Sequence, residues 1–168
     1  MRIVLARIDD RFIHGQVTVG WGQQLRPDHI ILANNEIAAD SWQSRVYRSS
    51  VAPSIQVSIL STSEAAAALR ATREQSGDGV TGLLLTGNPQ DMLFLHRHGR
   101  SLAEVNVGGM HYKPGKQELL PFVYVDARDV AAFRAFLASG TLLLARQVPG
   151  ARTTLIEERL LHDVERRL

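Results

Sequence analysis

The sequence contains no cysteine. Disulfides, thiolate-bound metals and cysteine nucleophiles are therefore excluded, and any covalent chemistry must use another type of side chain. Lysine is also scarce, since Lys113 and Lys116 are the only two. The other basic residues are arginines, whose planar guanidinium suits the recognition of phosphate. No run of lysine or arginine marks a nucleic-acid-binding tail, so we expect no nucleic-acid partner.

Long apolar runs are absent as well. The apolar run at the N-terminus is too short for a signal peptide, and no stretch approaches the roughly 18 apolar residues that a membrane span requires. We therefore expect a cytoplasmic protein that associates with a membrane only through a partner. The chain has 168 residues, 45% hydrophobic and 21% charged, with a formal net charge of +2. These values fit one globular domain with a short appendage.

Short apolar runs alternate with helical patterns, which predicts an α/β fold. Strands are predicted at residues 3–6, 29–33, 55–60, 80–85, 102–107, 119–125 and 141–147. Helices are predicted at residues 16–25, from 41 onward, at 62–73 with residues 75–79 closing it, at 89–98 and at 127–137. Because parallel strands are joined by right-handed crossovers, we expect one doubly wound, mostly parallel sheet of about seven strands with helices on both faces.

Two of the helix starts carry capping signals. Asp40 can cap a helix with Gln43 as its capping-box partner. Asn88 stands before a proline, which places a side-chain acceptor at the cap and a fixed φ at the first helical position. Trp21 and Trp42 lie on the apolar faces of the first two helices, so we expect both in the core.

The residues after position 150 follow a different pattern. Apolar side chains recur at four-residue intervals from 156 to 168 and charged side chains fill the other positions. This predicts an amphipathic helix at residues 152–168, so we divide the chain into a domain at 1–150 and a C-terminal helical extension at 151–168. The extension either packs on the domain's own sheet or frays, or else it contacts a second subunit or partner.

Ligands of doubly wound folds bind beyond the carboxyl ends of the strands, and the first such loop is the richest in chemistry. Residues 7–15 contain two carboxylates, two guanidiniums, one imidazole and a glycine. Free imidazole titrates near pH 6.5, so it is largely neutral and nucleophilic at pH 7. His14 is therefore our candidate for covalent chemistry. An ordinary salt-bridged surface loop is the alternative that the residues alone leave open.

Neighbouring groups can serve a phosphoryl group on His14. The transferring group spreads charge over three oxygens, so catalysis rests on positioning and charge stabilisation. Arg11 can clamp these oxygens with its two-pronged guanidinium, and Asp10 or Asp9 can hold Arg11 or the imidazole in orientation. Gly15 lets the backbone approach the phosphoryl group closely.

Four further residues lie at the same predicted end of the sheet. Gln16 stands at the start of the first helix, where free backbone N–H groups bind anions. Thr86, Gly108 and Gly109 can line a site for phosphate or a partner. For the two glycines a simple turn is the alternative.

The stretch at residues 7–17, followed by Gly20 and Trp21, resembles the signature of the IIB subunits of the mannose/fructose/sorbose family of the bacterial sugar phosphotransferase system. The family usually has leucine where this chain has Phe12, and either residue is an apolar anchor. The resemblance continues at residues 34–40, 106–112 and 147–149. It covers about residues 1–150 in order.

The resemblance implies a protein-histidine:sugar phosphotransferase. His14 would be phosphorylated on the ring nitrogen nearest the backbone by a IIA partner, and would pass the group to a sugar held by membrane IIC and IID subunits. Arg11 and Asp10 would be the phosphate-stabilising and orienting pair. The implied fold is a seven-stranded, mostly parallel sheet with one antiparallel edge strand. No cofactor is implied, and the sugar and any association between copies of the chain stay open.

Two other functions deserve comparison with this one. A regulatory or interaction module, uncoupled from a transporter, is favoured by the C-terminal amphipathic pattern. A nucleotide-binding enzyme is disfavoured, because no G-x-G-x-x-G follows the first strand. We expect no metal site, since His96 and His98 are two residues apart in a helix and do not share a face.

Overall fold

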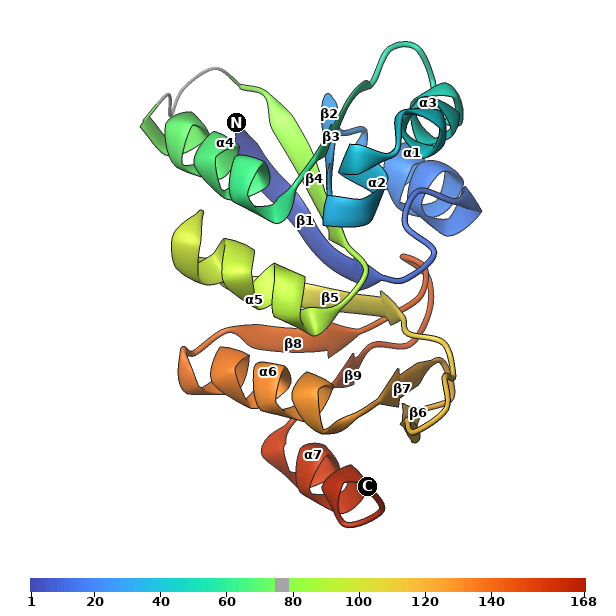
Figure 1. Cartoon of the computed structure of the whole chain (residues 1–168), viewed down its shortest axis with the longest axis vertical. Helices are drawn as coiled ribbons and strands as arrows, with labels where there is room; N and C mark the ends of the chain where they lie inside the picture. The colour runs from blue at the N-terminus through green and yellow to red at the C-terminus, as the bar shows by residue number, and fades with distance from the viewer. Residues whose placement is uncertain (75–78) are drawn as a thin grey trace.

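The computed structural model describes residues 1–74 and 79–168 and contains one seven-stranded sheet with helices on both faces (Figure 1). The strand order is β3-β2-β4-β1-β5-β8-β9, all parallel except β9, which is antiparallel to β8. The strands are β1 (Arg2–Asp9), β2 (His29–Ala33), β3 (Gln56–Leu60), β4 (Thr81–Thr86), β5 (Glu104–Gly109), β8 (Leu142–Ala145) and β9 (Thr154–Leu155). The predicted α/β fold and its antiparallel edge strand are confirmed.

The helices also follow the predicted order. They are η1 (Gln16–Trp21), a π-helical turn that continues into α1 (Gly22–Leu25), then α2 (Asn35–Ala39), α3 (Ser41–Ser49), α4 (Thr62–Glu74), α5 (Pro89–His98), α6 (Ala127–Ala138) and α7 (Glu158–Glu165). Of the predicted helix end at residues 75–79, residues 75–78 lie outside the described part of the chain. In the described part, no helix is long and apolar enough to cross a membrane.

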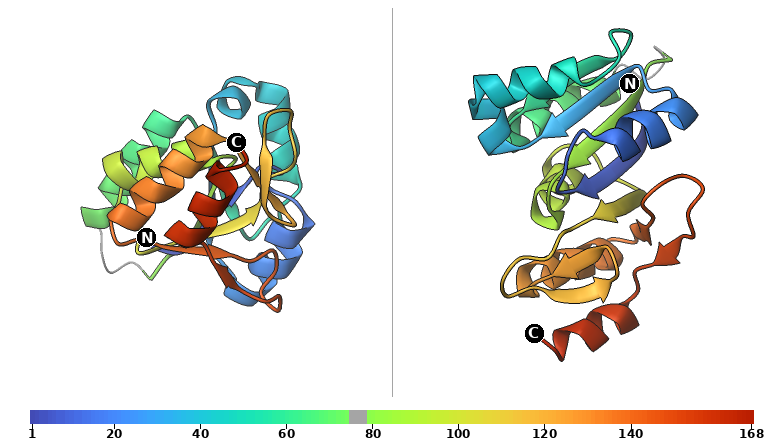
Figure 2. Two further views of the ribbon diagram at one scale, coloured as in Figure 1. Left: turned by 90° about the horizontal axis from the view of Figure 1, so that it is seen from below. Right: turned by 90° about the vertical axis from the view of Figure 1, so that its right-hand side faces the viewer.

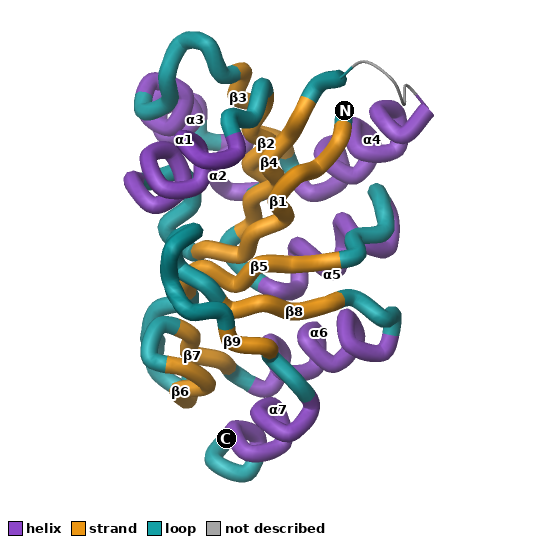
Figure 3. Tube along the Cα trace, turned by 180° about the vertical axis from the view of Figure 1, so that it is seen from behind, coloured by secondary structure: helices purple, strands orange, loops and turns teal. Residues whose placement is uncertain are grey.

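The central strands are apolar throughout because both of their faces are buried. In β2, Ile30 and Leu32 belong to one core, and Ile31 and Ala33 belong to the core on the other face. One core lies under α4, α5 and α6, which form a row in front of the sheet (Figure 1). The other lies under η1, α2 and α3. Seen from behind, β5 and β8 have no helix over them (Figure 3), and Figure 2 shows the same arrangement from two further sides.

The predicted strand at residues 119–125 is corrected by the structure. This segment forms a separate two-stranded hairpin of β6 (Gln117–Leu120) and β7 (Val123–Val125), outside the main sheet. Pro121 lies between the two strands, and proline cannot donate to a strand ladder. The seventh strand of the main sheet is β9 instead, from the segment that was predicted to be helical.

The C-terminal segment is therefore not one helix over residues 152–168. Residues Thr154–Leu155 pair with β8, and α7 begins only at Glu158. Leu161 and Val164 of α7 are fully buried in the same core as α6. Of the two alternatives for this segment, packing on the chain's own core is the one observed. The division of the chain at residue 150 stays a prediction.

The predicted caps form, but the capping box expected at Gln43 does not, because its side chain donates to Oδ2 of Asp40 at 2.9 Å. Only one of the two tryptophans is buried. Asp40 caps α3 by accepting hydrogen bonds from the N–H groups of Trp42 and Gln43. Trp21 is 2% exposed, as expected, whereas Trp42 is 65% exposed, so its predicted burial is wrong. The buried face of α3 is at Ser44, and residues two apart on a helix point in nearly opposite directions.

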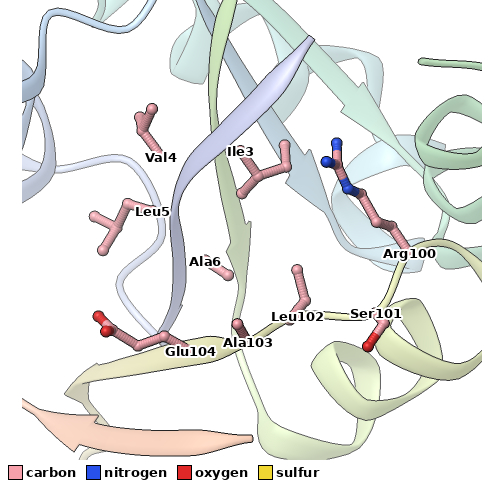
Figure 4. Close-up of a pocket in the computed structure, with 9 residues that line it drawn as sticks. All are labelled: Ile3, Val4, Leu5, Ala6, Arg100, Ser101, Leu102, Ala103 and Glu104. Atoms are coloured by element: carbon pink, nitrogen blue, oxygen red, sulfur yellow. The ribbon is translucent and has the colours of Figure 1, made fainter. Parts of the chain in front are cut away.

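A cavity of about 340 Å³ lies at the opposite end of the sheet from the predicted loops (Figure 4). It opens between residues 3–6 of β1 and residues 100–104. Since β1 pairs with β5 only from Arg7 onward, the two segments part before that point. The cavity therefore marks the place where the sheet splits.

Candidate functional site

The loop after β1 is held in a strained backbone conformation. Phe12 has a φ of 57°, in the left-handed region that costs an L-residue roughly 1–2 kcal/mol. Its ring packs over Gly87, where a Cβ atom would come within 2.7 Å of the ring, and meets Tyr47 edge-on at 6.1 Å between ring centroids. The ring therefore anchors the loop that presents His14, and strain of this kind is concentrated at functional sites.

His14 lies just before η1, with its side chain 20% exposed. Its Nδ1 atom is 2.8 Å from the carbonyl oxygen of Phe12. Because a carbonyl oxygen can only accept, Nδ1 carries the proton in this arrangement. The other ring nitrogen, Nε2, is 3.5 Å from Oε1 of Gln16 and 3.8 Å from Oδ2 of Asp9.

Asp9, at the end of β1, organises the charges around His14. Its buried Oδ1 accepts hydrogen bonds from the backbone N–H and the Nε of Arg11, both at 3.2 Å. Its Oδ2 accepts from Nη2 of Arg7 at 2.7 Å. Arg11 also donates to Oε1 of Gln16 at 2.6 Å, and its side chain is 34% exposed. A partly exposed guanidinium is thereby fixed beside the imidazole.

Asp10 makes different contacts from those that the resemblance implies. Its carboxylate accepts a hydrogen bond from the backbone N–H of His111 at 2.8 Å and lies 2.6 Å from Nδ1 of the same residue. Its own N–H donates to the carbonyl of Gly109 at 3.1 Å. Asp10 thus ties the loop after β1 to the loop after β5. Of the two acids that could hold Arg11, Asp9 is the one that does. The orienting role that the resemblance implies for Asp10 stays a prediction.

The two glycines at the end of β5 leave room for the two guanidiniums. A Cβ atom at Gly108 would lie 1.8 Å from Cζ of Arg7, and one at Gly109 would lie 3.3 Å from Nη2 of Arg11. Gly109 therefore borders the site, while Gly108 accommodates the buried guanidinium. Gly15 is exposed, with no atom within 4 Å of its ideal Cβ position.

Thr86 lies at the predicted end of β4 but is fully buried. Its hydroxyl donates to the carbonyl of Asn88 at 3.1 Å. This differs from the predicted contact with phosphate or a partner, since neither reaches a buried hydroxyl without a rearrangement of the chain. Asn88 caps α5 as expected, because its Oδ1 accepts from the N–H of Asp91 at 2.8 Å.

Sequence reasoning gave no role to two buried polar residues of this network, Arg7 and Asn106. Nη1 of Arg7 donates to Oδ1 of Asn106 at 2.5 Å and to the carbonyl of Arg146 at 3.0 Å. Both side chains interrupt apolar runs that were predicted to be strands or to border them. A polar residue in or beside an apolar run could have identified Arg7 and Asn106 as part of a polar network, because a buried polar group needs a hydrogen-bond partner.

A cleft of about 400 Å³ opens beside the Phe12 loop. It is lined by residues from the loops after β1, β2, β4 and β5, including both lysines of the chain, Lys113 and Lys116. The helices that follow β1 and β4 pass to opposite faces of the sheet, so the cleft lies at the switch in strand order where ligands are expected. The loops after β2, β4 and β5 thus meet the loop after β1 at this cleft.

The described residues contain no group of three histidine, aspartate or glutamate side chains that could hold a metal ion. His96 and His98 are engaged locally. Nδ1 of His96 accepts from the N–H of Leu102 at 3.0 Å, and Nδ1 of His98 lies 3.1 Å from the carbonyl of Phe94.

Comparison with known proteins agrees with this geometry. The family model described as the sorbose-subfamily IIB component of the PTS matches residues 3–166. The chain is 36% identical to the sorbose-specific EIIB component of Klebsiella pneumoniae, over 88% of each chain. It is 37% identical to the fructose-specific EIIB component of Bacillus subtilis (strain 168), over 89% of this chain and 90% of that protein.

The fold comparison gives the same result. The crystal structure of the IIBSor domain of the sorbose permease from Klebsiella pneumoniae has a TM-score of 0.86 and 33% identity, and the match covers 100% of this chain and 99% of that domain. IIB components are phosphotransferases that take part in sugar uptake. The chain belongs to the sorbose-subfamily IIB components of the phosphotransferase system.

Proposed function

We propose that this chain carries a phosphoryl group on His14, accepting it from a phosphorylated IIA partner and passing it to a sugar bound by membrane IIC and IID subunits. The observation that carries the proposal is the partly exposed imidazole beside the Arg11 guanidinium, which Asp9 and Gln16 hold in place. A nucleophile next to an oriented cation is the arrangement that phosphoryl transfer requires.

The chemistry consists of two displacements at phosphorus. A lone pair of the His14 ring attacks the phosphorus, the bond to the donor nitrogen breaks, and the donor histidine keeps that electron pair. A sugar hydroxyl then attacks, the bond to His14 breaks, and the hydroxyl proton is released. The family resemblance favours Nδ1 as the attacking atom. In the structure Nδ1 donates to Phe12, so attack through Nδ1 requires two changes. The proton has to leave Nδ1, so that the ring carries its proton on Nε2, and the ring has to turn about its Cβ–Cγ bond.

The groups around the ring support the phosphorylated state. Arg11 can donate two parallel hydrogen bonds to phosphoryl oxygens, which is stronger and more directional than a point charge. The first helical hydrogen bond runs from Val17 N–H to His14 O, so the N–H groups of Gly15 and Gln16 precede it and can donate to an anion. Gly109 places backbone beside Arg11 with no side chain in the way.

The partners follow from the same proposal. The chain is 34% identical to the mannose-specific EIIAB component of Escherichia coli (strain K12), a protein whose name joins a IIA and a IIB component and of which the match covers 45%. This supports a IIA protein as the phosphoryl donor. We place the chain in the cytoplasm, at the membrane only through the permease. A regulatory module is no longer favoured, since the apolar face of α7 is buried in the chain's own core.

Transfer of radiolabelled phosphate from a phosphorylated IIA protein tests the proposal. The wild-type chain should take up one label that is lost in acid and kept in alkali, and His14→Ala should take up none. His162→Ala removes an exposed imidazole from α7 and should label like the wild type. Label retained by His14→Ala would overturn the assignment of His14. Arg11→Lys should label more slowly, because a bidentate fork becomes a point charge.

A further inference from the structure

Arg7 is a charged side chain with no exposure to solvent. Its Nη2 donates to Oδ2 of Asp9 at 2.7 Å and to the carbonyl of Gln147 at 3.0 Å, while its Nη1 bonds Asn106 and the carbonyl of Arg146. Taking a cation out of water is costly. The hydrogen bonds of Nη1 and Nη2 offset that cost, whereas the buried Nε has no hydrogen-bond partner. The buried guanidinium of Arg7 contacts the Asp9 carboxylate of the site.

Stability alone gives no reason for this cation. Burial lowers the pKa of Arg7, and the Asp9 carboxylate offsets only part of this effect. Well-packed apolar side chains in place of a buried ion pair are often neutral or stabilising. The chain also keeps position 108 free of a side chain, since a Cβ atom there would lie 1.8 Å from Cζ of Arg7. The arginine at position 7 and the glycine at position 108 are therefore both needed for this one buried charge.

The charges explain what this cation does. Asp9 lies between Arg7 and Arg11 and contacts both, so two positive charges and one negative charge leave one positive charge in the group. Without Arg7, Asp9 would cancel the charge of Arg11. Its carboxylate, 3.8 Å from Nε2 of His14, would also repel an incoming phosphoryl group, which carries about −1.5 to −2 charges.

We propose that Arg7 is a positioning residue for phosphoryl transfer: it neutralises and holds Asp9, so that Arg11 keeps its charge for the phosphoryl group on His14. Arg7 acts through Asp9 and touches neither the imidazole nor the phosphoryl group. The inference rests on the proposed function and adds a buried residue to it. It predicts that the effect of Arg7 depends on the charges of Asp9 and Arg11.

The test is the initial rate of His14 labelling at a saturating concentration of phosphorylated IIA protein. Each variant is first shown by its thermal transition to be folded at the assay temperature. Arg7→Met should slow labelling about a hundredfold, the loss expected when a reacting group is displaced by about 1 Å. Arg7→Lys, which keeps the charge, should lose less. Adding Asp9→Asn to Arg7→Met should restore the rate about tenfold, because the carboxylate that cancels the charge of Arg11 is removed.

The Arg11→Gln background separates positioning from a general loss of structure. Residues that act as one unit are not additive, so Arg7→Met should slow Arg11→Gln by no more than about threefold. If the slowing caused by Arg7→Met and the slowing caused by Arg11→Gln multiplied in the double variant, this inference would be overturned. A folded Arg7→Met variant that labels within about twofold of the wild-type rate would overturn it as well. In either case, label on His14 would still uphold the proposed function. A wild-type chain that takes no label, or is labelled elsewhere, would overturn both.

Asn106→Leu serves if Arg7→Met does not fold. This variant keeps all three charges and removes the side-chain acceptor of Nη1 of Arg7. It should slow labelling about tenfold in the wild-type chain and hardly at all in Arg11→Gln, by the same non-additivity. Equal slowing in both backgrounds would show that residue 106 acts independently of Arg11 and would overturn the inference.

Discussion

Gly108→Ala adds one methyl group where the structure has no room for it. The new Cβ atom would lie 1.8 Å from Cζ, 2.0 Å from Nη2 and 2.3 Å from Nη1 of Arg7, so the guanidinium has to move. It would then lose its bonds to Asp9 and Asn106, and the buried Asp9 carboxylate would keep only Arg11 as a charged partner. Breaking a buried ion pair on one side costs about 3–5 kcal/mol. For a chain of 168 residues, this lowers Tm by roughly 6–20 °C.

Gly15→Ala is the matched control. Gly15 has φ −52° and ψ −38°, which alanine adopts readily, and no atom lies within 4 Å of its ideal Cβ position. Its substitution restricts the unfolded chain and should raise the free energy of unfolding by about 0.4–1 kcal/mol. Urea unfolding of both variants, extrapolated linearly to water, makes the comparison. If Gly108→Ala stayed within about 1 kcal/mol of the parent, the packing of Arg7 against residue 108 would be refuted.

Three further changes test other parts of the structure. Asp129→Ala removes a buried carboxylate 2.6 Å from a lysine ammonium and should lower the free energy of unfolding by about 3–5 kcal/mol; a loss below about 1 kcal/mol would contradict the pairing. Trp21→Ala should cost about 3–5 kcal/mol and the exposed Trp42→Ala less than about 0.5 kcal/mol, and equal costs in urea unfolding would show that their burial is misassigned. Arg134 holds the pKa of Glu165 below its ordinary value of 4.5, so this ion pair stabilises the fold above that pH and its contribution is lost as the pH falls through the lower folded-state pKa. Glu165→Gln should therefore reduce the difference in Tm between about pH 7 and about pH 3, and an unchanged difference would count against the pair.

The elements that local signals specify were predictable, and those that depend on pairing were not. Apolar runs and the caps at Asp40 and Asn88 placed most of the strands and helices within a few residues. The two-residue strand β9 has no pattern of its own and exists because the edge of β8 accepts it. Likewise, only the turn at Pro121 shows that residues 117–125 form a hairpin.

In the site, too, the residues that local sequence specifies could be predicted, and those that depend on distant segments could not. The signature loop and His14 could be found from the sequence, because the chemical groups are adjacent along the chain. The burial of Thr86 and the room needed at Gly108 could not, because both depend on segments distant in sequence. Gly108 comes close to Arg7 only after β1 and β5 have paired. A motif therefore locates the reacting group, while the residues that serve it are set by the sheet.

Strand geometry decides which of two adjacent acids serves the site. Side chains alternate between the faces of a strand, so Ile8 enters the core under α4, α5 and α6, while Arg7 and Asp9 face the side where η1 packs. Sequence reasoning ended this strand at residue 6, which left Asp9 and Asp10 as equal neighbours of Arg11. In the structure β1 continues to Asp9, which pairs with Gly109 of β5 after a shift in register between Ile8 and Asp9. That register commits Asp9 to the guanidiniums and sends Asp10, one residue later, to the loop after β5.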